Sequence, residues 1–277
     1  MSHPIDYLVI GHVTEDQTPE GVMIGGTVTY SGLTAHAFGK NVGVVTAAAP
    51  DFDLELLNQL EVHVQESEAT SAFKNIYDSQ GRRQKIISRA ANLTGKALPT
   101  EWSKVKLLHW APVANEIEAA FTDQISSQWL CLTPQGWLRY WDDQGNIALQ
   151  RWDALREYLS PNAIVVLSLE DIGGTLEPAA IIASECLILA ITLGAEGAVI
   201  YAGNEHRHLI APNVTEVDPT GCGDIFAATF FICLEQGEGP WTAASIANHI
   251  AAIAATRKGL DSIPRPKEIT NALKLRT

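Results

Sequence analysis

Short apolar runs alternate with segments of helical spacing along this chain, and that alternation is what most constrains its fold. Runs short enough to be buried strands lie at residues 5–11, 42–49, 105–110, 129–133, 163–169 and 186–193. Segments with helical spacing lie at 27–38, 54–60, 115–125, 152–159 and 177–184. Strands that alternate with helices predict an α/β fold, with a doubly wound, mostly parallel sheet flanked by helices.

A polar stretch interrupts this rhythm. Residues 71–77 and 82–89 are β-compatible but polar, and four residues of turn type join them. Such a hairpin cannot be a buried strand pair, so we expect a small β-strand lid, formed by residues of about 12–24 and 62–92, over a site. With 277 residues and no internal repeat or linker, the chain is expected to form a single domain over residues 1–277.

The C-terminal part predicts a hairpin and three helices. Residues 198–201 and 206–210 read as a hairpin, because Gly203 and Asn204 lie between two β-compatible runs. The runs with helical spacing lie at 225–234, closed by Gly237, and at 241–257 and 266–275.

The stretch from Val217 to Asp224 indicates a phosphate site. It lies between the strand-like run 206–217 and the helical run that starts at Ile225. Gly221 and Gly223 lack Cβ, so several N–H groups can approach an anion at the positive end of a helix dipole. A carboxylate beside bound phosphate is better suited to take a proton from an attacking hydroxyl, which favours Asp224 as a general base. The alternative is a helix-capping Asp with two turn glycines.

Charge and cysteine content exclude some classes of function. The net charge is −13, with 32 acidic residues against 19 Lys and Arg, which disfavours nucleic acid and anionic membranes as partners. The four cysteines show no metal-ligand spacing, and the N-terminus carries no basic segment followed by an apolar run. We therefore expect a cytoplasmic protein with free thiols.

The whole string around Asp224 resembles a known family signature. Asp218, Thr220, Gly221, Gly223 and Asp224 are similar to the Asp-Thr-x-Gly-x-Gly-Asp signature of the ribokinase-like (PfkB) carbohydrate kinases, with Cys222 where Ala is usual. Further resemblance lies in Thr192-x-Gly194-x-x-Gly197, in residues 251–259, in the Gly25–Gly26 pair and in the spacing from Gly11 to Asp16.

The resemblance implies a transferase that uses ATP and Mg²⁺ to phosphorylate an alcohol group. It makes Asp224 the general base, with Gly221, Cys222 and Gly223 donating backbone N–H groups to the developing charge. On the acceptor side it implies Asp16, Gly25, Gly26, Tyr30 and Arg89. On the nucleotide side it implies Thr192, Gly194, Gly197 and Asn248. Without the family spacing, Asp16 reads equally well as an exposed loop acid.

Two departures from the family pattern affect this transfer of roles. Tyr30 stands where the family often has Asn, which puts ribokinase-type acceptor contacts in doubt. The family's Asn-x-x-Glu, linked to magnesium, falls at residues 168–171, where Glu170 or Asp171 could organise the ion through water or Asp171 could cap a helix. In some relatives the positions of Asp218 and Thr220 help bind a monovalent cation, so K⁺ is a further expected cofactor.

Several acceptors and two functional classes remain open at this stage. Residues 133–139, which include Gln135, Trp137 and Arg139, are similar to a segment of inositol-kinase-like family members and favour a sugar or polyol acceptor. A nucleoside kinase of the same family is the alternative, and a non-catalytic regulatory protein is a second one. The resemblance also allows a homodimer. A P-loop and a Gly-x-Gly-x-x-Gly after the first strand are absent, and His206 with His208 lacks further metal ligands.

Overall fold

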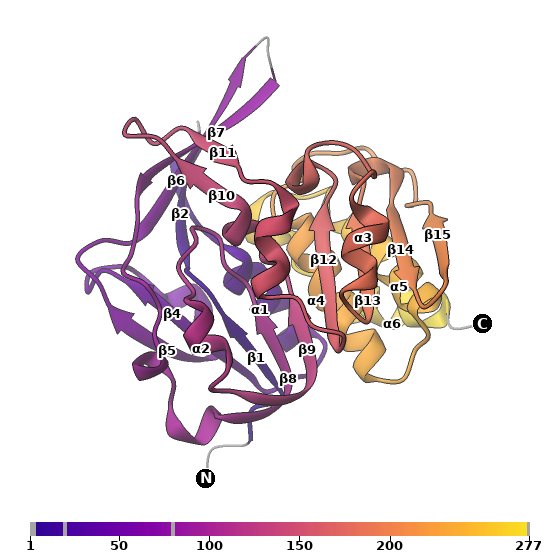
Figure 1. Ribbon diagram of the computed structural model, residues 1–277, viewed down its shortest axis with the longest axis horizontal. Helices are drawn as coiled ribbons and strands as arrows, with labels where there is room; N and C mark the ends of the chain where they lie inside the picture. The colour runs from indigo at the N-terminus through magenta and orange to yellow at the C-terminus, as the bar shows by residue number, and fades with distance from the viewer. Residues whose placement is uncertain (1–3, 19–20, 79–80, 276–277) are drawn as a thin grey trace.

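The computed structural model describes residues 4–18, 21–78 and 81–275, and within them a large sheet forms the centre of the protein (Figure 1). Its nine strands lie in the order β15-β14-β13-β12-β9-β8-β1-β4-β5. All neighbours from β5 to β13 pair in parallel, whereas β14 and β15 form an antiparallel edge. The strands span Tyr7–Ile10 (β1), Val42–Ala48 (β4), Glu61–Glu66 (β5), Lys104–Trp110 (β8), Ser126–Leu132 (β9), Ala163–Ser168 (β12), Ile188–Thr192 (β13), Ala198–Ala202 (β14) and Glu205–Leu209 (β15).

Helices cover both faces of this sheet, as a buried parallel sheet requires (Figure 1). On one face Tyr7 and Val9 pack with α1, α4, α5 and α6, and on the other Leu8 and Ile10 pack with α2 and α3. The helices span Thr27–Ala37 (α1), Ala119–Thr122 (α2), Ala179–Ser184 (α3), Cys222–Glu235 (α4), Pro240–Ala254 (α5) and Pro266–Ala272 (α6). The predicted doubly wound α/β fold is confirmed.

The central helix α4 is apolar on all sides because it is buried on all sides. Residues 225–234 are all buried, and the neighbouring helices α1 and α5 both pack on it. Gly237, with φ of 94°, follows its last turn and ends it, as predicted. The first turn of α4 is therefore held rigidly by the core at the carboxyl edge of the parallel strands, where ligands bind in such folds.

A second, four-stranded sheet stands over that edge (Figure 1). Its order is β3-β2-β6-β7, with strands at Gly21–Gly25 (β3), Thr14–Thr18 (β2), Ser71–Asp78 (β6) and Gly81–Ser88 (β7). The predicted polar hairpin is thus β6 and β7, although residues 79–80 lie outside the described residues. The inclusion of residues 62–64 in the lid was wrong, because Val62 and Val64 belong to β5 and pair with Val44 and Thr46 of the central sheet.

A small hairpin that the sequence analysis missed supports this lid. Strands β10 (Arg139–Trp141) and β11 (Ile147–Leu149) pair with each other, and the Ile86 N–H of β7 donates to the Gly145 carbonyl at 2.9 Å. Trp141 and Ile147 pack against the buried side chains of Phe73 and Ile86. The hairpin therefore fixes the lid strands to the segment that follows β9.

Several predicted crossover helices are shorter than expected. Residues 54–60 and 152–159 contain only 3₁₀ turns, at Glu55–Leu57 and Trp152–Glu157, and 115–125 contains only α2. The strand-like run 206–217 is β-structure only as far as Leu209. No helix in the part of the chain that the structure describes is long and apolar enough to cross a membrane.

Candidate active site

The first turn of α4 has the geometry of an anion site. Gly221 caps the helix with φ of 77°, a conformation that L side chains rarely adopt. A Cβ on Gly221 would overlap the ring of Tyr30, whereas a Cβ on Gly223 would meet nothing within 4 Å. Glycine at 221 is thus required by the fold, and glycine at 223 leaves open space in front of the helix N-terminus.

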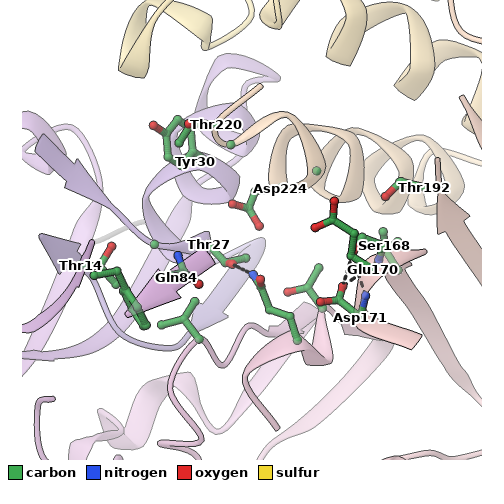
Figure 2. Close-up of a pocket in the computed structure, with 18 of the residues that line it drawn as sticks. Thr14, Thr27, Tyr30, Gln84, Ser168, Glu170, Asp171, Thr192, Thr220 and Asp224 are labelled. Atoms are coloured by element: carbon green, nitrogen blue, oxygen red, sulfur yellow. Dashed lines mark hydrogen bonds between the residues drawn. The ribbon is translucent and has the colours of Figure 1, made fainter. Parts of the chain in front are cut away.

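A cavity of about 260 Å³ lies in front of this turn (Figure 2). Strand ends, the lid and α1 all contribute to its wall, as expected at the carboxyl edge of a doubly wound sheet. Most of its lining side chains are polar: Thr14, Asp16, Thr27, Tyr30, Gln84, Thr133, Gln135, Arg139, Ser168, Glu170, Asp171, Thr192, Thr220 and Asp224.

The carboxyl of Asp224 is a weaker acid in this cavity than in water. Burial removes water from its carboxyl and raises its pKa to about 6, and the charges of Asp16 and Asp171 act in the same direction. The hydroxyl of Thr27, as a hydrogen-bond donor, and the charge of Arg139 oppose this shift. The result is a carboxyl that exchanges protons close to neutral pH, which suits a general base.

Three of the predicted acceptor residues line the cavity, whereas Gly25 and Arg89 do not. Asp16, Gly26 and Tyr30 line the cavity, and Thr14 donates to the Asp16 carboxylate at 3.0 Å. Gly25 lies behind Asp16, where any Cβ would overlap that carboxylate, so it makes room for the acid without lining the cavity itself. Tyr30 is almost fully buried, with its ring packed under Gly221.

Arg89, like Gly25, does not line the cavity. Its guanidinium donates to the carbonyls of Ala114, Ala90 and Asn115 and to the side chain of Asn92, and it packs over the Trp141 ring. These contacts hold the end of β7 to the loop after β8. The structure therefore gives Arg89 a role in fixing the lid, because its hydrogen-bond donors are directed at backbone.

Four of the polar cavity residues had no assigned role in the sequence: Thr14, Thr27, Gln84 and Thr133. Gln135 and Arg139 were noted only as part of a similar segment, yet both line the wall, while Trp137 is buried and stacks on Tyr158 as a core residue. For Thr133, Gln135 and Arg139 the signal is their position at or shortly after the end of a predicted strand, where side chains reach the carboxyl edge of the sheet. Thr27, in a predicted helix, and Gln84, in the predicted hairpin, carry no such signal.

A second cavity, of about 430 Å³, lies on the other side of the α4 N-terminus. Thr192, Gly194, Gly197 and Asn248, which the sequence assigned to a nucleotide, all line it. Small residues at the end of α5 and just after it, and small or apolar residues of the loop before α4, also line it: Ala251, Ala252, Ala255, Ala211, Pro212 and Val214. Asn248 donates to the Leu209 carbonyl at 2.7 Å and so holds β15 against α5. Glu170 and Gly223 border both cavities.

Glu170 and Asp171, which the sequence suggested for magnesium, lie in a turn at the end of β12. One carboxylate oxygen of Asp171, Oδ2, accepts from the Ser168 N–H at 2.8 Å and from its hydroxyl at 2.7 Å (Figure 2). Asp171 thus caps the turn, and the exposed Glu170 is the carboxylate that borders both cavities. Among the described residues, no three His, Cys, Asp or Glu side chains are grouped to hold a metal. One carboxylate with water and substrate oxygens still fits Mg²⁺.

Asp218 closes the loop that precedes α4. Its two carboxylate oxygens accept from the N–H of Thr220 at 2.9 Å and from the N–H of Gly259 at 3.2 Å. The N–H groups of Val217 and Asp218 donate to the Ala255 carbonyl. These bonds tie the α4 loop to the segment after α5, which is the place that the sequence suggested for a monovalent cation.

Comparisons with known proteins agree with this architecture. A family model described as pfkB family carbohydrate kinase matches residues 166–268. A cytidine kinase of Thermococcus kodakarensis is 26% identical over 260 residues, which is 84% of this chain and 90% of that protein. A ribokinase of Schizosaccharomyces pombe is 32% identical over 130 residues, which is 43% of this chain and 41% of that protein.

Solved structures share the fold over nearly the whole chain. A pyrophosphate-dependent kinase of the ribokinase family, solved with a pyrophosphate analogue and myo-inositol, has a TM-score of 0.82 at 19% identity and covers 96% of this chain and 99% of that one. A ribokinase from Thermotoga maritima has a TM-score of 0.71 at 21% identity, with 98% and 99% covered. Residues 166–268 therefore match the pfkB carbohydrate kinase family, and the whole chain has the ribokinase-like fold.

Proposed function

We propose that this protein is an ATP-dependent kinase that transfers the γ-phosphate of ATP to a hydroxyl of a sugar or cyclic polyol. One observation carries the proposal. Asp224 stands in the first turn of α4, faces a polar cavity, and lies next to a second, more apolar cavity that shares the same helix N-terminus. A base that lies between an acceptor site and a donor site is the arrangement that phosphoryl transfer to an alcohol requires.

The chemistry of the first cavity supports a polyhydroxylated acceptor. Carboxylate, amide and hydroxyl groups line it, and these groups exchange hydrogen bonds with alcohols in both directions. The buried aromatic ring in its wall, Phe73, has the Arg139 guanidinium 5.7 Å from its centre. That face of the ring is therefore covered by a cation, which disfavours a stacked base in that position and favours a sugar or polyol.

The second cavity supports a nucleotide as the donor. Its volume of about 430 Å³ lies within the roughly 300–1,000 Å³ typical of small-molecule sites. The alanines of α5 and Gly194 and Gly197 after β13 leave a flat, mostly apolar space suited to a base and its sugar. A bare pyrophosphate would leave this space unused, so the shape favours ATP.

The reaction follows from the position of each group. Asp224 takes the proton of the acceptor hydroxyl as its oxygen attacks the γ-phosphorus. The backbone N–H groups of Gly221 and Gly223, at the positive end of α4, stabilise charge that develops on the phosphoryl oxygens. The Cys222 N–H, which was predicted to act with them, instead donates to the Pro219 carbonyl at 3.1 Å. Mg²⁺ would neutralise the ATP phosphates, and Glu170 is placed to hold it through water. A monovalent cation beside Asp218 would order the same loop.

A nucleoside acceptor is the second candidate. The relative that aligns over 84% of this chain is a cytidine kinase, and the acceptor cavity is bounded by the lid, whose position can accommodate different acceptors. The two candidates share Asp224 and the donor cavity. They differ only in what Asp16, Gln84 and Arg139 contact.

A matrix of donors and acceptors tests both halves of the proposal. The protein is incubated with Mg²⁺ and K⁺, with either ATP or pyrophosphate as donor, and with sugars, inositols or nucleosides as acceptor, and phosphorylated product is measured by mass spectrometry. We expect product from ATP with a sugar or inositol, formed about 10²- to 10⁴-fold more slowly by Asp224→Asn. A clear preference for nucleosides would favour the second candidate, and turnover with pyrophosphate alone would refute ATP. ATP binding without product from any acceptor would contradict catalysis.

A further inference from the structure

A chain of side chains leads from the outer wall of the acceptor cavity to the catalytic corner. The Arg139 Nη2 group donates to Gln135 Oε1 at 2.8 Å, and Gln135 Nε2 donates to Thr27 Oγ1 at 3.0 Å. Figure 2 shows the Thr27 side chain beside the Asp224 carboxyl. A hydrogen bond from the Thr27 hydroxyl lowers the pKa of that carboxyl. We propose that Arg139, Gln135 and Thr27 are positioning residues that orient the Asp224 carboxyl for proton abstraction, an inference that rests on the proposed kinase activity.

The polarity of this chain is set at its outer end. A guanidinium can only donate, so Gln135 must present its oxygen to Arg139 and its amide group to Thr27. Thr27 Oγ1 then accepts from Gln135, which leaves its single proton to point at Asp224. The chain therefore delivers one donor to one carboxylate oxygen and leaves the other oxygen of Asp224 for the acceptor hydroxyl.

Both ends of the chain are anchored. Arg139 also donates from Nη1 to the Val113 carbonyl at 3.0 Å and packs over the Phe73 ring, so it is held by the segment after β8 and by the lid. Thr27 opens α1, and further along the same helix the Ser31 hydroxyl donates to the Asp224 carbonyl at 3.1 Å. Helix α1 thus holds both the backbone and the side chain of Asp224.

The chain also acts on the charge of Asp224. The acids Asp16, from β2, and Asp171, from the turn after β12, raise its pKa, and burial raises it further. Thr27, from α1, and Arg139, from β10, lower it. Glu170 is a further acid in the same wall. Loss of the Thr27 donor therefore leaves only Arg139 to oppose the raising influences, and the carboxyl will hold its proton to a higher pH.

Thr27→Val tests this directly because it keeps the shape of the side chain and removes the hydroxyl. We expect kcat to fall about tenfold, the order of one hydrogen bond to a charged group. The acid limb of the pH profile of kcat/KM should move to higher pH, and KM for ATP should stay within about twofold, because Thr27 does not line the donor cavity. Thr27→Ser restores the hydroxyl and should restore the wild-type profile.

Two further variants sharpen the test. Gln135→Glu replaces the amide donor with an acceptor that competes for the Thr27 proton, so it should shift the acid limb in the same direction as Thr27→Val. Thr34→Val, in the same helix, removes a buried hydroxyl that has no hydrogen-bond partner among the described residues. It should leave the acid limb unchanged.

A readout that does not depend on turnover separates this inference from the kinase assignment. With ¹³C-labelled Asp, the carboxyl resonance of Asp224 is identified by its loss in Asp224→Asn and titrated in wild type and Thr27→Val. We expect a higher midpoint in Thr27→Val and a wild-type midpoint in Thr27→Ser. Equal midpoints in all three proteins would refute the positioning role of Arg139, Gln135 and Thr27, even if the protein is a kinase. A change only in KM for the acceptor would show that Thr27 is a substrate contact instead.

Discussion

The two cavities on either side of the α4 N-terminus are built in different ways. Most of the donor cavity comes from residues 192–255, uses small apolar side chains, and was located from short sequence motifs. The acceptor cavity gathers polar side chains from Thr14 to Asp224, contributed by both sheets, α1 and α4. The donor cavity depends on space beside the backbone, whereas the acceptor cavity depends on a hydrogen-bonded arrangement. Substitutions should therefore act on the first through volume and on the second through lost donors and acceptors.

Asp224→Asn should give the largest effect, because the proposed transfer of phosphate from the donor cavity to the acceptor cavity depends on the Asp224 carboxylate. We expect a loss of turnover of about 10²- to 10⁴-fold, the usual contribution of a general base. Nucleotide affinity, measured by calorimetry, should remain near that of wild type. The raised pKa means that the ionised carboxyl costs stability above pH 6, so the variant should melt no lower than wild type at pH 8. Turnover within a fewfold of wild type would show that Asp224 is not the general base.

Gly223→Val tests the open space between the cavities. A Cβ at this position meets nothing within 4 Å, so the variant should fold normally with an unchanged melting temperature. The added side chain should crowd the phosphates, with a loss of kcat/KM of about 10²-fold, comparable to removal of one stabilising donor. Full activity of a folded Gly223→Val would show that the phosphates pass elsewhere.

Ala251→Phe should affect the donor cavity alone. Ala251 lines that cavity and is absent from the lining of the acceptor cavity. A bulky ring there should raise KM for ATP about tenfold or more, equivalent to about 1.4 kcal/mol of binding, while KM for the acceptor changes little. Steady-state kinetics with each substrate varied in turn measures this. An equal rise in both KM values would mean that the cavities do not act separately.

Cys222→Ala should give the smallest effect. Cys222 lines the donor cavity, but its backbone N–H, at the first position of α4, donates to the Pro219 carbonyl. Burial raises the pKa of its thiol to about 12, so the sulfur stays protonated and unreactive near neutral pH. Activity within about twofold of wild type is expected, since Ala preserves the backbone donor. A loss comparable to that of Gly223→Val would assign a role to the thiol.

The sequence grouped residues that line one cavity, the proposed donor side, because the features of that side are local. Gly194 and Gly197 lie within a few residues of a strand end, and both have positive φ angles that favour glycine. The Gly221 to Asp224 string likewise sits on a single strand-to-helix connection. These positions need glycine so that a ligand can approach the backbone closely. Because the glycines are near one another in the sequence, they can be recognised without knowledge of the fold.

The acceptor side was only partly predictable because its contacts join distant residues. Gln135 reaches Thr27 across more than a hundred residues, and the β10–β11 hairpin that carries Arg139 gave no strand signal of its own. Arg89 looked available for substrate, but its hydrogen bonds to backbone carbonyls depend on how the loop after β8 folds. Periodicity also overestimated the crossover helices, since tertiary packing ends α2 after four residues.

The pH dependence of kcat/KM tests the central claim most directly, because it reports ionisation of the free enzyme. Asp224 must be ionised to accept the hydroxyl proton, and its pKa is raised to about 6, so the rate should fall as the pH decreases through about 6. Below this pH, kcat/KM should fall by nearly tenfold per pH unit. The residual activity of Asp224→Asn should not show this decrease. A wild-type rate that stays constant down to about pH 4.5 would contradict a base with this pKa.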